Sequence, residues 1–307
     1  MPELLARGER VAREADCVAC HSTHDGAPFA GGLEMGTPIG SIYATNITPD
    51  PETGIGRYTL AEFDRAIRHG VAPDGSRLYP AMPYPSYAKM ADADIEALYA
   101  FFTEGVGPVS QPNRAPDIPW PLNMRWPLAL WNAAFTEPGT YRPDPSKDGE
   151  WNRGAYLVQA AGHCGSCHTP RALTMNEKAY DQSSPLYLSG ALLDGWYAPS
   201  LLQDHNTGLG RWSEDDIAAY LAEGRNRHSV VFGSMAEVYN NSLQFMDGAD
   251  LRAIAHYLKS LPGDPERDGA PWEPVAPAAA PAGSPASRSP GEVGEGQAGD
   301  GLAAQAA

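Results

Sequence analysis

Two five-residue runs contain every cysteine of the chain. Cys17-Val18-Ala19-Cys20-His21 and Cys164-Gly165-Ser166-Cys167-His168 both have the form C-x-x-C-H. In such a run each thiol can add across a haem vinyl group, and the following histidine is placed to ligate the iron. A zinc site would need four ligands gathered in a closed set, and a redox dithiol has no need of an adjacent histidine. The spacing therefore predicts two covalently bound haem c groups.

Each haem iron also needs a ligand on the face opposite its histidine. Met82 lies between two prolines, in Tyr79-Pro80-Ala81-Met82-Pro83-Tyr84, and the prolines stiffen the chain around a weak neutral thioether ligand. We therefore predict Met82 as the ligand of the first iron. For the second iron we predict Met235, which follows Met82 by 153 residues and occupies the matching place in an internal repeat. The rival ligands are Met35, Met90 and His69 for the first iron, and Met246 and His228 for the second.

The repeat extends well beyond the two motifs. Thr53-Gly54, Gly56-Arg57 and Gly70 recur 154 residues later as Thr207-Gly208, Gly210-Arg211 and Gly224. Apolar residues at helical spacing predict helices over residues 4–15, 59–70, 93–103 and 247–261. Thr59 and Glu62 have the spacing of a capping box. Gly8 is costly inside a helix, so we expect the first of these helices to cross another closely at that point.

Composition limits the possible partners. The chain has 307 residues, 42% of them hydrophobic, which suits two soluble domains and provides no apolar run long enough to span a bilayer. With 38 acidic and 22 basic side chains the formal net charge is −16, so we expect no nucleic acid partner and favour a basic protein surface. No paired acids, activated nucleophile or phosphate-binding loop predicts substrate chemistry.

Changes in composition along the chain predict its organisation. We expect a first haem domain at residues 1–104, a connector at 105–150, a second haem domain at 151–263 and a disordered Ala/Pro/Gly-rich tail at 264–307. The connector is rich in proline and tryptophan, and we expect its aromatic residues to pack between the two domains. The alternative is that the stretch around 124–135 meets a partner or a membrane surface.

Several segments resemble one protein family. They are the two C-x-x-C-H runs, residues 43–50 (YATNITPD), the Thr53-Gly54-Ile55-Gly56 turn, the strip at 79–84 and Ile118-Pro119-Trp120-Pro121. Over residues 3–262 the sequence resembles the cytochrome c subunit of membrane-bound bacterial dehydrogenases, which include alcohol, gluconate and sorbitol dehydrogenases. The resemblance implies an all-α fold of two tandem class I-type cytochrome c domains. It also implies ligation of one haem by His21 with Met82 and of the other by His168 with Met235.

The same resemblance implies a function and a location. The chain would accept electrons from a dehydrogenase catalytic subunit and pass them toward ubiquinone or a terminal oxidase. It would do so in the periplasm, at the outer face of the cytoplasmic membrane. Family members commonly have a third haem domain and a signal peptide, neither of which is recognisable in this sequence. We expect either a mature or truncated form, or a misplaced start.

Three alternatives remain open at this stage. A free-standing periplasmic dihaem shuttle would use the same ligands without a tightly bound partner. A dihaem peroxidase would need one iron with an open or displaceable position. A zinc-stapled interaction protein would use the cysteines without haem.

Overall fold

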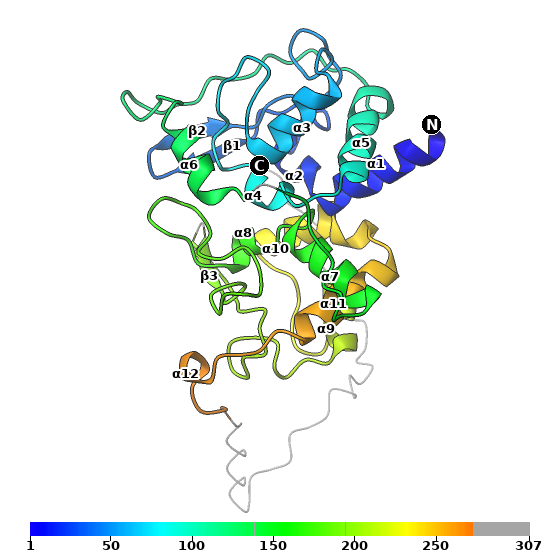
Figure 1. The fold of residues 1–307 in the computed structure, drawn as a ribbon, viewed down its shortest axis with the longest axis vertical. Helices are drawn as coiled ribbons and strands as arrows, with labels where there is room; N and C mark the ends of the chain where they lie inside the picture. The colour runs from blue at the N-terminus through cyan, green and yellow to red at the C-terminus, as the bar shows by residue number, and fades with distance from the viewer. Residues whose placement is uncertain (138, 194, 273–307) are drawn as a thin grey trace, which may run out of the picture. The chain divides into compact units, whose positions relative to one another are not determined.

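The computed structural model describes residues 1–137, 139–193 and 195–272. Contacts divide the chain after Pro271, and residues 1–271 form one compact unit. Within it the repeat is visible as two successive sets of helices (Figure 1). The first copy contains α1 (Pro2–Glu14), α2 (Cys17–His21), α3 (Leu60–His69), α4 (Tyr84–Tyr87), α5 (Asp92–Ala100) and the π-helical turn η1 (Phe101–Gly105). The second copy contains α7 (Gly149–Gln159), α8 (Gly165–His168), α9 (Glu214–Glu223), α10 (Ser234–Asn241), the 3₁₀ turn η2 (Leu243–Phe245) and α11 (Gly248–Lys259).

Each copy also contains a short antiparallel hairpin, which the expected all-α fold did not include. Strand β1 (Glu34–Thr37) pairs with β2 (Gly40–Tyr43), and β3 (Ala191–Leu193) pairs with β4 (Trp196–Ala198). Strands of three or four residues are too short to show a period-two pattern against a glycine-rich background, so periodicity did not reveal them. The fold is thus helical with two small hairpins.

The first and last helices of each copy cross at a glycine, as Gly8 predicts. Helix α1 packs against α5, and α7 packs against α11 (Figure 1). A methyl group at Gly8 would overlap the carbonyl oxygen of Ala97, and one at Gly154 would overlap that of Ala253. An ion pair lies beside each crossing, with Arg7 Nε 2.9 Å from Asp94 and Arg153 Nε 2.8 Å from Asp250. Glycine therefore allows the helix backbones to approach more closely than any other residue would.

The ends of α3 confirm the predicted caps. Thr59 Oγ1 accepts a hydrogen bond from the backbone N–H of Glu62, and the Glu62 carboxylate accepts one from the backbone N–H of Thr59. Gly70 ends the helix in the left-handed conformation, with φ of 58°. Helix α9 repeats the arrangement with Ser213 and Asp216 at its start and Gly224 at its end. Asp247 lies at the N-cap position of α11, but its side chain makes no capping hydrogen bond.

The two copies share a buried core. Tyr156, Ala160 and Ala161 of the second copy belong to the apolar cluster built around Val11, Phe63, Ile95 and Phe102 of the first. The Tyr156 hydroxyl donates to the Asp94 carboxylate and accepts from the backbone N–H of Ala91. The copies are therefore packed directly against each other, in addition to being joined by the connector.

The connector contacts both copies. It contains one further helix, α6 (Leu128–Phe135). The Trp131 ring packs edge-on against Tyr84 of the first copy, with centroids 5.7 Å apart, and its Nε1 donates to the carbonyl of Thr174 in the second copy at 2.8 Å. Packing between the copies is therefore confirmed for Trp131. Trp120 and Trp126, in contrast, are 79% and 67% exposed.

The segment after Asp264 differs from the predicted tail. Residues 265–268 form the short helix α12 (Pro265–Asp268). The Asp268 carboxylate accepts hydrogen bonds from the backbone N–H groups of His205, Asn206 and Thr207. Residues 265–268 are held by a charged side chain bound to backbone N–H groups. The prediction of a disordered tail considered only the lack of large apolar residues, so it did not detect these contacts. The rest of the predicted tail, residues 273–307, lies outside the described residues.

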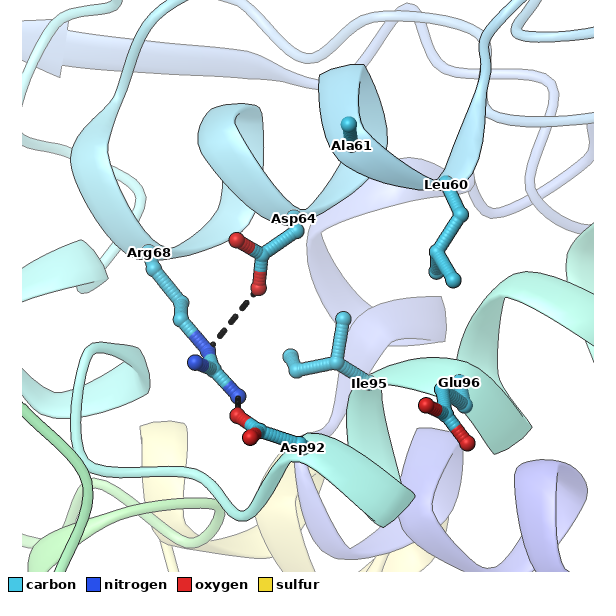
Figure 2. A pocket seen from close by; sticks show the side chains of 7 residues that line it. All are labelled: Leu60, Ala61, Asp64, Arg68, Asp92, Ile95 and Glu96. Atoms are coloured by element: carbon cyan, nitrogen blue, oxygen red, sulfur yellow. Dashed lines mark hydrogen bonds and ion pairs between the residues drawn. The ribbon is translucent and has the colours of Figure 1, made fainter.

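A shallow hollow between α3 and α5 contains none of the predicted haem ligands. Figure 2 shows Arg68 reaching across it, with Nε 3.1 Å from Asp64 and Nη2 2.7 Å from Asp92. These ion pairs link α3 to α5. Among the described residues no helix combines the length and the apolar character that crossing a bilayer requires.

Candidate haem-binding sites

The first C-x-x-C-H motif forms a single helical turn directly after α1. Asp16 separates the two helices in the left-handed conformation, with φ of 49°. Cys17 and Cys20 are free thiols, and Cys17 packs against the apolar cluster of the first copy. His21 Nδ1 lies 2.6 Å from the backbone carbonyl oxygen of Thr45. Because a carbonyl only accepts, Nδ1 must bear the proton, which leaves the lone pair on Nε2.

The second motif repeats this geometry. His163 precedes it with φ of 35°, as Asp16 precedes the first. Cys164 packs against the apolar cluster of the second copy. His168 Nδ1 lies 2.8 Å from the carbonyl oxygen of Pro199, which stands 154 residues after Thr45. A histidine that ligates a metal through one ring nitrogen usually donates from the other to such a partner, so both histidines fit the proximal role in haem c.

Burial sets the charge of these groups. It lowers the pKa of His21 and of His168, although the carbonyl bonded to each ring acts in the opposite direction. Both rings are therefore neutral near pH 7, as an iron ligand must be. Burial also raises the pKa of Cys20 to about 11 and of Cys164 to about 12, so the free cysteines are protonated thiols.

The two predicted methionine ligands occupy matching places. Met82 is partly buried against the cluster that includes Cys17, and Met235 is partly buried against the cluster that includes Cys164. A tyrosine follows each methionine and packs over the glycine that ends the preceding long helix: Tyr84 lies over Gly70, and Tyr239 lies over Gly224. Each methionine thus packs against the same apolar cluster as the first cysteine of its own copy, and the ligand assignment itself remains a prediction.

The rival ligands have different surroundings. Met90 is fully buried in the core of the first copy, His69 is exposed, and Met35 lies in β1.

Of the rivals for the second iron, His228 stacks on Trp212 with ring centroids 5.2 Å apart. Met246 packs against the same cluster as Met235, so burial alone does not separate these two.

The two motifs lie near each other. Besides burial, the electrostatic interactions that raise the pKa of Cys20 include those with the Cys167 thiol of the second motif and with Glu237 in α10. Helix α10, which contains Met235, packs against α2, which contains the first motif. In the part of the chain that the structure describes, no three His, Cys, Asp or Glu side chains are grouped so as to hold a metal ion.

Several residues of these sites were not identified from the sequence. Thr45 and Pro199 act through backbone carbonyls, which any residue possesses, but the constant offset of 154 residues could have paired them. Asn132 and Glu177 were missed for a different reason. Each is a buried polar residue whose partners, Tyr84 and Ser166, become neighbours only in the folded chain.

Comparison with known proteins agrees with the two motifs. The sequence pattern of the family described as Cytochrome c matches twice, at residues 5–104 and 152–262. The chain is 56% identical over 269 residues to the "Alcohol dehydrogenase (quinone), cytochrome c subunit" of Gluconacetobacter polyoxogenes, a match that covers 87% of this chain and 58% of that protein. It is also 56% identical over 262 residues to the "Gluconate 2-dehydrogenase cytochrome c subunit" of Pantoea cypripedii, covering 84% of this chain and 59% of that protein.

A relative of similar length completes the comparison. The "Diheme cytochrome c-type" of Cereibacter sphaeroides is 35% identical over 280 residues, which cover 85% of this chain and 89% of that protein. The chain spans less than three fifths of the two longer relatives. Membership implies covalently bound haem c, which the histidine and cysteine geometry fits. The chain belongs to the cytochrome c family, and its relatives include the cytochrome c subunits of bacterial alcohol and gluconate dehydrogenases.

Proposed function

We propose that this chain is a dihaem electron carrier with histidine and methionine ligands on both irons. Cys17 and Cys20 would attach the first haem, with His21 and Met82 as its axial ligands. Cys164 and Cys167 would attach the second, with His168 and Met235 as its axial ligands. The observation that supports this most strongly is the pair of Nδ1 contacts, to Thr45 and to Pro199, because each leaves the lone pair of a motif histidine on Nε2, where it could ligate an iron.

The haem groups supply one-electron redox chemistry, and the protein positions them. The cysteines would attach each haem to a helical turn through thioether bonds, and the carbonyl contact fixes the orientation of each imidazole. The two motifs are near enough to interact electrostatically, which supports passage of an electron from one haem to the other within the chain. The two copies are also joined by a buried core, so their relative position is held by packing.

We further propose a place for this carrier between two larger partners. A dehydrogenase catalytic subunit would reduce one haem, and ubiquinone or a terminal oxidase would accept the electron from the other. The printed names of the longer relatives support the first partner, because they describe cytochrome c subunits of dehydrogenases. Thioether attachment of haem takes place outside the cytoplasm, which supports a periplasmic location.

A peripheral contact with the outer face of the cytoplasmic membrane is part of the same proposal. Five large apolar side chains between residues 120 and 130 are exposed: Trp120, Leu122, Met124, Trp126 and Leu130. Residues 118–136 contain no acidic side chain and one basic one, Arg125, in a chain with net charge −16. Such an apolar segment suits a partner protein or a lipid surface better than it suits water.

A free-standing dihaem shuttle is the second candidate. The Cereibacter sphaeroides relative favours it, because that protein is described as a diheme cytochrome and the match covers 89% of its length. A shuttle would have the same ligands and the same pair of haems but no tightly bound catalytic subunit. The two candidates therefore differ in their partners and not in the sites described above.

One preparation tests the shared part of these proposals. The chain is exported to a periplasm that contains the haem-attachment machinery, and its mass is measured under denaturing conditions. We expect two covalently retained haems and a ferric methionine-to-iron charge-transfer band. Met82→His and Met235→His variants should each remove part of that band, whereas Met90→Leu should leave it intact. A haem-free mass would contradict haem attachment, and ready binding of cyanide without the band would favour a peroxidase.

Co-purification then separates the two candidates. The chain is expressed in its native host with an affinity tag, and the membrane fraction is solubilised before capture. Stoichiometric recovery of a large dehydrogenase subunit would support the subunit role. Recovery of the dihaem chain alone, from the soluble fraction, would support the shuttle.

A further inference from the structure

A buried carboxylate contacts the two middle residues of the second haem-attachment motif, Gly165 and Ser166. Glu177 is only 6% exposed, and its Oε1 accepts a hydrogen bond from Ser166 Oγ at 3.0 Å. Ser166 stands between Cys164 and Cys167, the two predicted points of attachment. The other carboxylate oxygen lies so close to Gly165 that a methyl group there would be 2.5 Å from it. The carboxylate thus faces the central pair of the motif.

Two cations and several polar groups surround this carboxylate. Arg171 donates from Nη2 to the carbonyl of Ser166 at 2.7 Å, and its backbone forms an isolated β-bridge with Glu177. Lys89 comes from the first copy and donates to the carbonyl of Tyr180 at 2.6 Å. The charges of both cations act on Glu177. Among the described residues, Cys164, Tyr180 and Tyr187 also interact with it electrostatically.

The first motif has no hydroxyl that could hold a carboxylate as Ser166 does, although Glu237 of α10 interacts electrostatically with Cys20. Val18 and Ala19 take the places of Gly165 and Ser166, and Ala30 stands 147 residues before Glu177. The first motif also has a carboxylate next to it in the sequence, that of Asp16, which immediately precedes Cys17. The surroundings of the two motifs therefore differ in where negative charge is placed and in whether that charge is hydrogen-bonded to the motif.

We propose that Glu177 lowers the reduction potential of the second haem by placing negative charge beside its attachment site. This inference rests on the proposed function, since it assumes a haem at Cys164 and Cys167. Reduction adds one electron and converts ferric to ferrous iron, which removes one positive charge from the centre. A nearby anion stabilises the ferric form more than the ferrous form, so the centre becomes harder to reduce.

The ionisation of Glu177 makes this effect depend on pH. Burial raises the pKa of Glu177 to about 7, although Arg171, the Ser166 hydroxyl and Lys89 act in the opposite direction. The carboxylate is neutral below this pH and charged above it. The potential of the second haem should therefore fall as pH rises through 7, and reduction there should be accompanied by partial uptake of one proton at Glu177.

Redox titration of the full chain with both haems attached tests this inference. The Met235→His variant first identifies which of the two midpoint potentials belongs to the second haem. In Glu177→Gln, which keeps an acceptor for Ser166, that midpoint should rise and become less dependent on pH, and the other should stay unchanged. Glu223→Gln is the matched control, because it removes the same charge from an exposed position at the end of α9.

The inference fails if neither midpoint moves, or if both move together by the amount seen in Glu223→Gln. If Glu177→Gln does not retain its haem, the unmodified chain decides the matter through its own pH dependence. A fall between pH 6 and 8 in the midpoint that Met235→His assigns to the second haem would support the role of Glu177. A constant midpoint for that haem would overturn it, whatever the first haem does beside the partly buried Asp16. Absence of covalent haem from the unmodified chain would instead overturn the proposed function, and this inference with it.

Discussion

Arg153 donates a hydrogen bond from Nη2 to the carboxylate of Glu14 across 3.1 Å, and this contact joins the opening helices of the two copies. Arg153 also binds Asp250 of its own copy at 2.7 Å. The same arginine therefore stabilises the helix crossing of the second copy and links it to the first. Glu14 is only 8% exposed, so its charge is held in a largely dehydrated environment.

The pH dependence of stability should reveal this burial. Burial raises the pKa of Glu14 to about 7 from 4.5, with Arg153 acting in the opposite direction. The pKa of Glu14 is higher in the folded chain than in the unfolded chain, so protonation of Glu14 stabilises the fold. This stabilisation is fully present below pH 4.5 and is lost as pH rises through 7. The difference corresponds to about 3 kcal/mol of unfolding free energy. Glu14→Gln should remove that loss, so that urea denaturation at pH 5 and pH 8 gives more similar values than in the unmodified chain.

The control for this experiment is Glu9→Gln, which changes an exposed carboxylate of the same helix. Glu9 pairs with Arg13, one turn away at 3.1 Å. An exposed pair of this kind contributes little to stability. If the free energy of unfolding depends on pH to the same extent in Glu14→Gln and Glu9→Gln, the raised pKa of the buried Glu14 carboxylate is contradicted.

The glycine at the crossing of α7 and α11 should tolerate no side chain. In Gly154→Ala the new methyl group would overlap the carbonyl oxygen of Ala253, so α7 and α11 must move apart. We expect a loss of about 3 kcal/mol in chemical denaturation, from overpacking. Gly149→Ala is the matched control in the same helix, because a methyl group added there would have no atom within 4 Å, and it should be neutral or slightly stabilising. A stable Gly154→Ala protein would contradict the close crossing.

Asn132 should hold the Met82 strip in place from the connector. Its Oδ1 accepts from the Tyr84 hydroxyl at 2.7 Å, and its Nδ2 donates to the carbonyl of His69 at 2.7 Å. Asn132→Ala leaves both partners unsatisfied and should cost about 2 kcal/mol. The ferric methionine-to-iron charge-transfer band of the first haem should weaken as well. Asn123→Ala, at an exposed position of the same connector, should change neither quantity, and an unaltered band in Asn132→Ala would contradict the positioning role.

Local signals in the sequence predicted the elements that depend on local chemistry. The capping box at Thr59, the terminal glycine at residue 70 and the apolar spacing of α1, α5 and α11 each act within one helix, and all appear in the structure. The constant offset between the copies extended these predictions to the second half. Gly8 even predicted a tertiary contact, because glycine inside a helix is costly unless something packs against it.

Features that depend on distant partners could not be predicted in this way. The bond from Tyr156 to Asp94 and the place of Glu177 behind Ser166 join residues whose proximity is created by folding. The hairpins were missed because three or four residues carry too little pattern. For the proposed haem sites, one motif predicts both the cysteines that attach the haem and the histidine that ligates its iron. A methionine ligand has to be predicted from among several candidates, because no local motif marks it.

The segment after Asp264 provides a last test, since composition alone places it in a tail. Asp268 accepts hydrogen bonds from three consecutive backbone N–H groups, those of residues 205, 206 and 207, and Arg267 lies 2.7 Å from the buried Asp204. Asp268→Ala should leave these N–H groups without their partner and cost about 1–2 kcal/mol. Hydrogen exchange at residues 205–207 should become faster at the same time. Glu266→Ala, which alters an exposed side chain of α12, should leave both quantities unchanged. If exchange at 205–207 is as fast in the unmodified chain as in Asp268→Ala, the segment is not bound there and the tail begins at Asp264 after all.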